Sequence, residues 1–166
     1  MAKNYSDPTD PADPIDPTIV RAGVDDLDEL LPLFAGYLRF YGRAVDDARV
    51  RNFLLDRLER GESVVFLARR DGHGVGFVQL YPAFASLSQA RSWILNDLFV
   101  VETARGGGIA RALMAAAADL GRETGAVELM LQTARDNDAA QKLYAGLGWV
   151  RDDHFLVYTL DPRSRN

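Results

Sequence analysis

The chain contains no cysteine, and this absence excludes disulfide bridges, a catalytic thiol and any thiolate metal site. Only two histidines are present, His73 and His154, so a metal site built on a histidine cluster is not expected. No apolar run reaches the roughly 20 residues that span a bilayer, and the amino terminus lacks the apolar core of a secretory signal. We therefore expect a cytoplasmic protein without a membrane contact or a bound metal.

The first 17 residues differ in composition from the rest of the chain. An Asp-Pro pair recurs every third residue from Asp7 to Pro17, so prolines remove backbone donors while the aspartates repel one another. We predict a disordered tail over residues 1–17 and one domain over residues 18–166. The tail carries much of the net charge of −5, and the nearly neutral remainder does not favour a nucleic-acid partner.

The stretch from Trp93 to Thr124 reads as a strand, a glycine turn and a helix. Its three consecutive glycines, residues 106–108, let backbone N–H groups approach a ligand, and a helix amino terminus favours phosphate. A Walker A loop is excluded because Ile109 stands where it needs lysine, and a Rossmann fingerprint because Arg111 replaces its third glycine. The pattern predicts a pyrophosphate-binding loop; a flexible surface turn is the alternative.

The spacing Arg105-x-x-Gly108-x-Ala110 resembles the R/Q-x-x-G-x-G/A acetyl-CoA loop of the GCN5-related N-acetyltransferase (GNAT) family. Residues 96–100 look like the fourth strand of that family, and residues 137–149 look like its CoA-binding helix. The resemblance covers about residues 19–160, and within the family the chain is most similar to the diamine and histone-type acetyltransferases.

The resemblance, together with the hydrophobic periodicity, implies a single-domain α/β GNAT fold. We expect a mixed, mostly antiparallel seven-stranded sheet with helices on both faces, splayed between strands 4 and 5. Residues 71–72 predict a hairpin between the second and third strands, and residues 82–89 predict a loop. The last two strands are expected at residues 149–150 and 155–160.

The resemblance also implies where acetyl-CoA, the expected co-substrate, would lie. The backbone of the fourth strand would bind the pantetheine, the glycine loop would surround the pyrophosphate, and an asparagine would meet the pantetheine arm. The implied cofactor-binding residues are Leu98, Phe99, Val100, Arg105, Gly106, Gly107, Gly108, Ile109, Ala110, Arg111 and Asn137.

Two residues are candidates for proton transfer. Tyr144 lies seven residues after Asn137, about two helical turns, and its phenol, with a pKa near ~10, could protonate the departing thiolate. A tyrosine that only packs in the core is the alternative. Diamine acetyltransferases carry Glu where this chain has Asn96, so the general base would be Asp97, which could equally be a structural carboxylate. In a regular strand these two neighbours face opposite sides, and a bulge would change that.

The predicted first helix ends in the aromatic residues Tyr37, Phe40 and Tyr41. Aromatic residues at helical spacing are commonly core residues. The family resemblance implies instead a wall of the acceptor-amine site, to which Asn96 would also contribute.

The predicted function is therefore transfer of an acetyl group from acetyl-CoA directly to a primary amine, on a small molecule or a lysine-like side chain. Direct transfer is expected because the chain has no cysteine to carry the acetyl group. The alternative is a non-catalytic acyl-CoA-binding or sensor module, which the missing glutamate at Asn96 leaves open. The apolar residues 155–158 could form a sheet edge that needs covering, so we also expect a homodimer.

Overall fold

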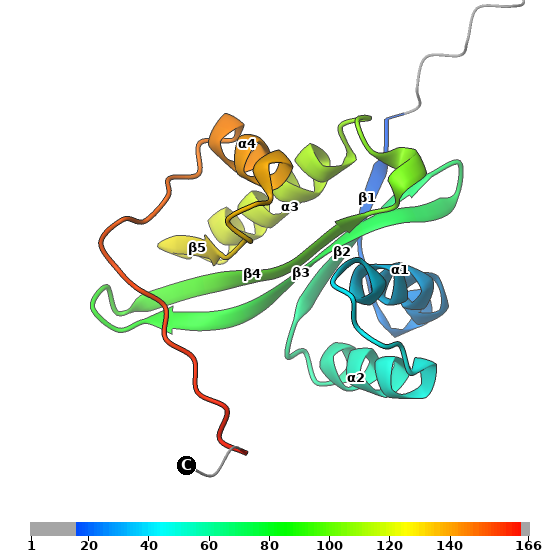
Figure 1. Ribbon diagram of the computed structural model, residues 1–166, viewed down its shortest axis with the longest axis horizontal. Coiled ribbons are helices and arrows are strands. Elements are labelled where there is room, and N and C mark those ends of the chain that lie inside the picture. Colours follow the sequence, from blue (N-terminus) through cyan, green and yellow to red (C-terminus); the bar gives the residue numbers. More distant parts are fainter. Residues whose placement is uncertain (1–15, 164–166) are drawn as a thin grey trace, which may run out of the picture. The chain divides into compact units, whose positions relative to one another are not determined.

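A computed structural model describes residues 16–163 of the chain (Figure 1). The chain divides into two compact units, Met1–Gln132 and Thr133–Asn166, and each is described by itself. Nearly all of the predicted acidic tail lies outside the described residues, so its disorder stays a prediction.

A five-stranded sheet with the strand order β1-β2-β3-β4-β5 forms the first unit. Its strands are β1 (Thr18–Arg21), β2 (Val64–Arg70), β3 (His73–Ala85), β4 (Ala90–Val100) and β5 (Glu128–Leu131). The first four pair antiparallel, whereas β4 and β5 pair parallel. Parallel neighbours need a crossover connection, and a helix makes it here.

Helices cover both faces of this sheet, as predicted. Within the first unit, α1 (Leu27–Phe40) and α2 (Asp47–Glu59) lie on one face and α3 (Ile109–Glu123) on the other (Figure 1). Short 3-10 helices precede α1 (Val24–Asp26) and α3 (Glu102–Ala104). The described part of the second unit contains α4 (Asp138–Gly146). Among residues 16–163, no helix combines the length and apolar content that crossing a bilayer requires.

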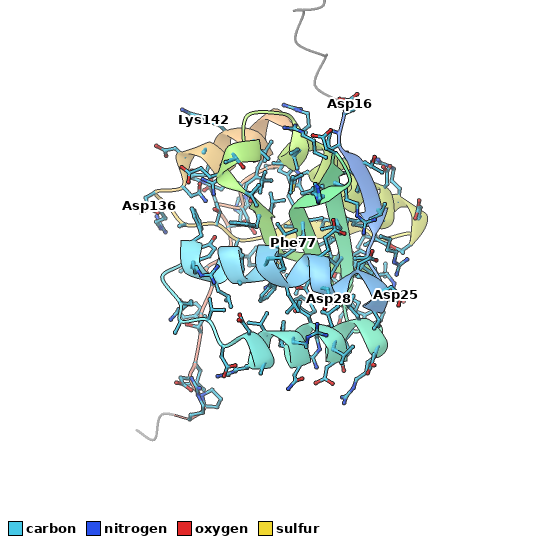
Figure 2. The ribbon with its side chains drawn as sticks, turned by 90° about the vertical axis from the view of Figure 1, so that its right-hand side faces the viewer. Asp16, Asp25, Asp28, Phe77, Asp136 and Lys142 are labelled. Carbon is cyan, nitrogen blue, oxygen red and sulfur yellow. The ribbon has the colours of Figure 1, made fainter. Side chains whose placement is uncertain are left out.

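The helices form where apolar residues recur at helical spacing. In α1, Leu27, Leu30 and Phe34 are buried against the sheet, and the Phe34 ring stacks on that of Phe77 with centroids 5.6 Å apart. Figure 2 labels Phe77 next to α1. In α3 the buried stripe includes the small residue Ala117, which lets the helix approach the sheet closely. Each face of the sheet is thus covered by an amphipathic helix.

The hairpins test the predicted turns. The predicted Asp71-Gly72 turn is confirmed, because Arg70 pairs with His73 across it. The predicted loop at residues 82–89 is confirmed only for residues 86–89, since β3 continues to Ala85. Pro82 is tolerated there because β2 begins opposite Leu80, so no β2 residue needs a hydrogen bond from position 82.

The prediction of seven strands is wrong: within residues 16–163 the sheet has five. Residues 149–150 and 155–160 form no strand. The Asp152 carboxylate accepts hydrogen bonds from the backbone N–H groups of His154 (2.7 Å) and Phe155 (3.2 Å). A local turn therefore takes donors that a ladder would use. An apolar pattern favours a strand conformation, but the pattern alone does not provide the partner strand with which the segment must pair.

Candidate active site

Strand β4 loses one of its two neighbours halfway along its length. Its parallel pairing with β5 runs from Ser92↔Glu128 to Leu95↔Leu131 and ends there. Its antiparallel pairing with β3 continues to Val100. In the described part of the chain no strand pairs with the other edge of residues 96–100. The pairing ends where β5 itself ends, at Leu131, so the splay between the fourth and fifth strands stays a prediction.

The open edge presents backbone groups of two of the three predicted pantetheine-binding residues. The Val101 N–H donates to Val75 O across β3 at 2.9 Å. Because main-chain direction alternates along an antiparallel strand, Phe99 also faces β3, whereas Leu98 and Val100 face the open edge. The Phe99 ring packs on the α1 side, where a Cβ added to Gly36 would meet it at 2.9 Å. Phe99 thus lies beside the edge without offering its main chain to it.

A β-bulge at the start of the open edge decides where the two polar residues of β4 point. Gln79 pairs with Asp97 and Leu80 with Leu95, so Asn96 is the extra residue of the bulge. Asn96 is exposed, while Asp97 is only 4% exposed and lies on the face that carries α1. The Asn96 amide donates to Asp97 Oδ1 at 3.1 Å.

Asp97 is a buried carboxylate surrounded by polar and aromatic side chains. Burial raises its pKa above the ordinary value, and hydrogen bonds from the Tyr37 hydroxyl and the Asn96 amide oppose this rise. Burial and the nearby Asp97 charge likewise raise the pKa of Tyr37, and they raise that of Tyr81 to about 12. The two phenols therefore stay protonated near neutral pH, and Asp97 is the carboxylate of this cluster.

The aromatic residues at the end of α1 form one contact chain that reaches from the core to the surface. The Tyr37 ring lies 5.1 Å from that of Tyr41, which lies 5.1 Å from that of Phe40. Tyr37 is half-buried beside Phe99, at 6.5 Å, whereas Phe40 is 56% and Tyr41 50% exposed. The predicted wall is thus partly core and partly exposed surface.

The glycine loop meets the amino terminus of α3 with its backbone donors unused. Gly106 and Gly108 have φ of +79° and +76°, in the left-handed region that favours glycine. The first backbone bond of the helix runs from Ala112 N to Gly108 O at 3.0 Å. The N–H groups of residues 106–111 have no backbone acceptor among the described residues, as an anion-binding helix terminus requires.

The other predicted loop residues divide between anchoring and exposure. Ile109 is buried and Ala110 half-buried, so they hold the first turn of α3 against the sheet, while Arg111 is exposed. Arg105 Nε donates to Val100 O at 3.1 Å, and its guanidinium lies 5.6 Å from the Phe40 ring centre. Arg105 thus connects the loop with the open edge of β4 and with the aromatic wall.

The two predicted residues of the second unit are described separately. Asn137 is the N-cap of α4, and its side-chain oxygen accepts from Ala140 N at 3.2 Å. Tyr144 is half-buried in the same helix, with its ring 6.2 Å from that of Trp149.

The sequence analysis missed several polar residues that lie near Asp97 and the glycine loop. Gln79 is fully buried opposite Asp97 and donates to Ser63 Oγ at 2.8 Å, and Tyr81 lies on the same face two residues later. A glutamine in an otherwise apolar strand was the available signal. Arg70 lies against Gly107, and no pattern in the sequence indicated that contact.

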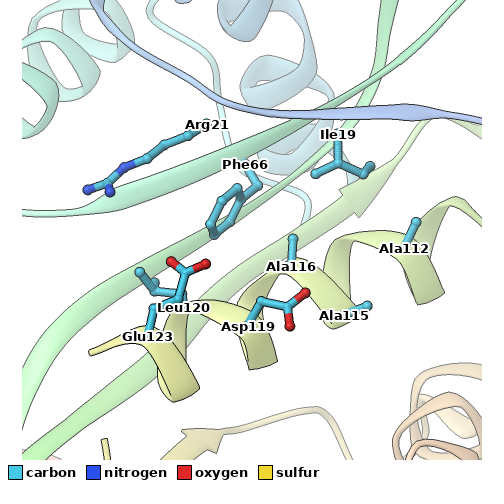
Figure 3. Close-up of a pocket in the computed structure, with 9 residues that line it drawn as sticks. All are labelled: Ile19, Arg21, Phe66, Ala112, Ala115, Ala116, Asp119, Leu120 and Glu123. Carbon is cyan, nitrogen blue, oxygen red and sulfur yellow. The ribbon is translucent and has the colours of Figure 1, made fainter. Parts of the chain in front are cut away.

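An open groove of about 430 Å³ lies elsewhere in the first unit, between α3 and the strands β1 and β2 (Figure 3). Its floor includes Phe66 and Ile19, and the alanines of α3 form one wall. Asp119 and Glu123 line it, and Asp119 pairs with Arg122. It contains none of the predicted site residues. Among the described residues, no acidic or histidine cluster has the arrangement of a metal site.

Comparisons with known proteins agree with this geometry. Residues 28–149 match the model of the acetyltransferase (GNAT) family. The chain is 43% identical over 147 residues to the Bacillus subtilis (strain 168) protein named Uncharacterized N-acetyltransferase YhfO, covering 89% of this chain and 99% of that one.

Solved structures give the same result. The crystal structure of a probable acetyltransferase superposes with a TM-score of 0.84 at 44% identity, over 89% of this chain and 99% of that one. An aminoglycoside N-acetyltransferase, AAC(6')-Iy, solved in complex with CoA, has a TM-score of 0.74 at 20% identity over 87% and 94% of the two chains, a likeness of fold alone. The family model and the relatives of high identity show that the chain belongs to the GNAT family of acetyl-CoA-dependent N-acetyltransferases.

Proposed function

We propose that this GNAT enzyme transfers the acetyl group directly from acetyl-CoA to a primary amine, carried by a small molecule or by a lysine-like side chain. The observation that carries the proposal is the open edge of β4, which brings free backbone groups, a glycine loop and the buried Asp97 together in one unit. No cysteine is available to hold an acetyl intermediate, so the amine attacks the thioester itself.

The proposed cofactor site follows the open edge. The outward main-chain groups of Leu98 and the N–H of Val100 hydrogen-bond the pantetheine, which takes the place of a neighbouring strand, while Val100 O accepts from Arg105 Nε. A backbone N–H there polarises the thioester carbonyl as charge develops on its oxygen. The loop from Arg105 to Arg111 surrounds the pyrophosphate with free N–H groups and the positive end of α3. Phe99 contributes through its ring, beside Tyr37.

Asp97 is the proposed acceptor of the proton that the amine must lose. An ammonium ion is not nucleophilic, and a carboxylate with a raised pKa is a better base than an ordinary one. The Tyr37 hydroxyl donates to Asp97 and orients it. Because Asp97 is only 4% exposed, we infer that the proton reaches it through a water molecule. The exposed Asn96 then contacts the acceptor amine and takes no part in removing the proton of that amine.

The leaving thiolate also needs a proton, and Tyr144 is the proposed donor. A tyrosine side chain carries a phenolic proton that it can donate. Asn137, two turns earlier in the chain, is proposed to contact the pantetheine arm while its side-chain oxygen caps α4. Both roles rest on the family resemblance of residues 137–149.

The acceptor is proposed to enter along Tyr37, Phe40 and Tyr41. Exposed aromatic faces attract ammonium groups, each by about 0.5–1 kcal/mol, and the buried Asp97 carboxylate lies behind them. These features suit a diamine or a lysine-bearing peptide, the acceptors of the diamine and histone-type enzymes.

The first experiment measures thiol release from acetyl-CoA with a panel of amines. The panel contains polyamines, amino-acid amines, lysine peptides and aminoglycosides. Release that depends on a primary amine supports the proposal. Tight CoA binding without release for any amine would instead indicate a binding module, and absence of CoA binding would reject the cofactor site.

A homodimer is proposed on separate grounds. Phe155, Leu156, Val157 and Tyr158 are each at least 66% exposed, although all are large and hydrophobic. Exposed apolar runs of this kind commonly mark interfaces between proteins. Light scattering at micromolar concentration should give twice the 18.3 kDa of one chain, and a monomer mass rejects the proposal.

A further inference from the structure

The half-buried arginines of the described chain differ in what balances their charge. There are four: Arg57, Arg69, Arg70 and Arg91. Arg57 and Arg69 contact carboxylates, and Arg91 lies over the rings of Phe84 and Trp93. In residues 16–163, Arg70 forms no ion pair and lies over no ring. A partly desolvated cation without a counter-charge is costly, so the exception needs a reason.

Arg69 and Arg70 are neighbours that β2 directs to opposite faces of the sheet. Arg69 reaches the α1 side, where its Nη2 lies 2.6 Å from both Asp26 Oδ1 and Glu29 Oε2. Arg70 reaches the glycine loop, where its Nη2 donates to Gly107 O over 3.4 Å. Its Nε is shielded from solvent and has no acceptor among the described residues. The guanidinium is therefore positioned but poorly satisfied.

The loop has room for this guanidinium because its middle residue is glycine. A Cβ at position 107 would lie 2.5 Å from Arg70 Nη2, whereas a Cβ at Gly106 or Gly108 would meet nothing within 4 Å. The outer glycines serve the left-handed backbone, whereas a side chain at Gly107 would require the Arg70 guanidinium to shift.

We propose that Arg70 is a phosphate-binding residue of this acetyl-CoA site, and that the CoA pyrophosphate is its missing counter-ion. The inference rests on the proposed function, because it requires the pyrophosphate to lie at the glycine loop. The planar guanidinium fork matches phosphate oxygens, and a charge-assisted bond to phosphate replaces the long one to Gly107 O. Arg70 thereby adds a fixed positive charge to a loop that otherwise offers backbone N–H groups.

The test is calorimetric binding of CoA and of 3′-dephospho-CoA to four proteins. They are the wild type, Arg70→Gln, Arg70→Lys and the control Arg60→Gln, which removes the same charge from an exposed position in the turn after α2. Arg70→Gln should bind both ligands roughly 10- to 100-fold more weakly, as for a lost bond to a charged group. Arg70→Lys should lose less because it keeps the charge. Arg60→Gln should match the wild type.

Other outcomes overturn the proposal in distinguishable ways. Wild-type affinity in a folded Arg70→Gln protein removes Arg70 from the site while leaving the proposed function intact. A loss seen with CoA but not with 3′-dephospho-CoA assigns Arg70 to the 3′-phosphate and overturns the pyrophosphate contact. Equal losses in Arg70→Gln and Arg70→Lys, with a lowered unfolding temperature in both, indicate a purely structural contact. A wild type that binds neither ligand rejects the proposed function, and this inference with it.

Discussion

The two halves of β4 belong to one strand but differ in how their backbone is used. Ser92–Leu95 pairs with β3 on one side and β5 on the other, and both Trp93 and Leu95 are buried. Asp97–Val100 pairs with β3 alone and follows a bulge at Asn96, and its first residue, Asp97, is a buried carboxylate. In the closed half, both edges of the strand form hydrogen bonds within the sheet. In the open half, one edge leaves backbone groups available to a ligand. Substitutions in the two halves should therefore have separable effects on stability and on activity.

The largest effect is expected where the glycine loop follows the open half. Gly108→Glu should abolish measurable CoA binding, because it puts a carboxylate against the pyrophosphate at a residue with φ of +76°. Gly108→Ala is the matched control, since it carries the same backbone strain without the charge, and it should bind with intermediate affinity. Calorimetry decides the matter, and unchanged CoA affinity in a folded Gly108→Glu protein would reject the loop assignment.

The next largest effect is expected on the rate of acetyl transfer, with CoA affinity unchanged. Tyr144→Phe keeps the ring and its contact with Trp149 but removes the proton proposed for the thiolate. Single-turnover acetyl transfer should fall by about 10²–10⁴-fold, the usual contribution of a general acid, while CoA affinity stays near wild type. A wild-type single-turnover rate would exclude Tyr144 from the mechanism. Joint loss of CoA affinity and fold would show that its hydroxyl holds the structure.

In the closed half, Leu95→Ala should reverse the pattern. Leu95 is 3% exposed, so truncation leaves a cavity and should lower the free energy of unfolding by about 2–5 kcal/mol. Residual folded protein should bind CoA with wild-type affinity, because the open half keeps its backbone. Denaturant unfolding with and without CoA measures both quantities, and a selective loss of CoA affinity would break the distinction between the halves.

Within the open half, Asp97→Asn should change activity and stability in opposite directions: the rate of acetyl transfer falls, whereas stability rises at higher pH. Acetyl transfer should fall by about 10²-fold if Asp97 accepts the proton of the amine. Burial raises the folded-state pKa of Asp97 above its unfolded value, so its contribution to stability is full below the unfolded pKa and is lost as pH rises through the folded pKa. Above that pH, Asp97→Asn should be the more stable protein. Unfolding temperatures measured across pH test this sign, and a parallel decline of both proteins would contradict it.

The smallest effect on the fold is expected in the exposed apolar segment. Leu156→Asp should change the free energy of unfolding by no more than about 0.5 kcal/mol, because Leu156 is 77% exposed. It should nevertheless convert the proposed dimer to a monomer in light scattering. Arg151→Asp is a control change of charge outside the apolar run. An unchanged dimer in Leu156→Asp would move the interface elsewhere.

The sequence predicted the parts of the fold whose cause is local. Asp71-Gly72 closes a hairpin, and the hydrophobic periodicity places α1. Prediction failed where a segment needed a remote partner. Residues 155–158 have the apolar character of a strand, but Asp152 turns the chain before them and no strand pairs with them among the described residues.

The same distinction between local causes and remote partners applies to the candidate site. The glycine loop could be recognised from the sequence because positive φ and unused N–H groups are properties of a few consecutive residues. The sequence also supplied Asn96 and Asp97, but only the register with β3 decided that Asp97 is the buried one, since a bulge is defined by two strands and not by one. Arg69 and Arg70 are identical in type and adjacent in sequence, yet one neutralises two carboxylates and the other reaches Gly107. Tertiary structure decided that difference, because the charge around a side chain depends on which distant residues the fold brings beside it.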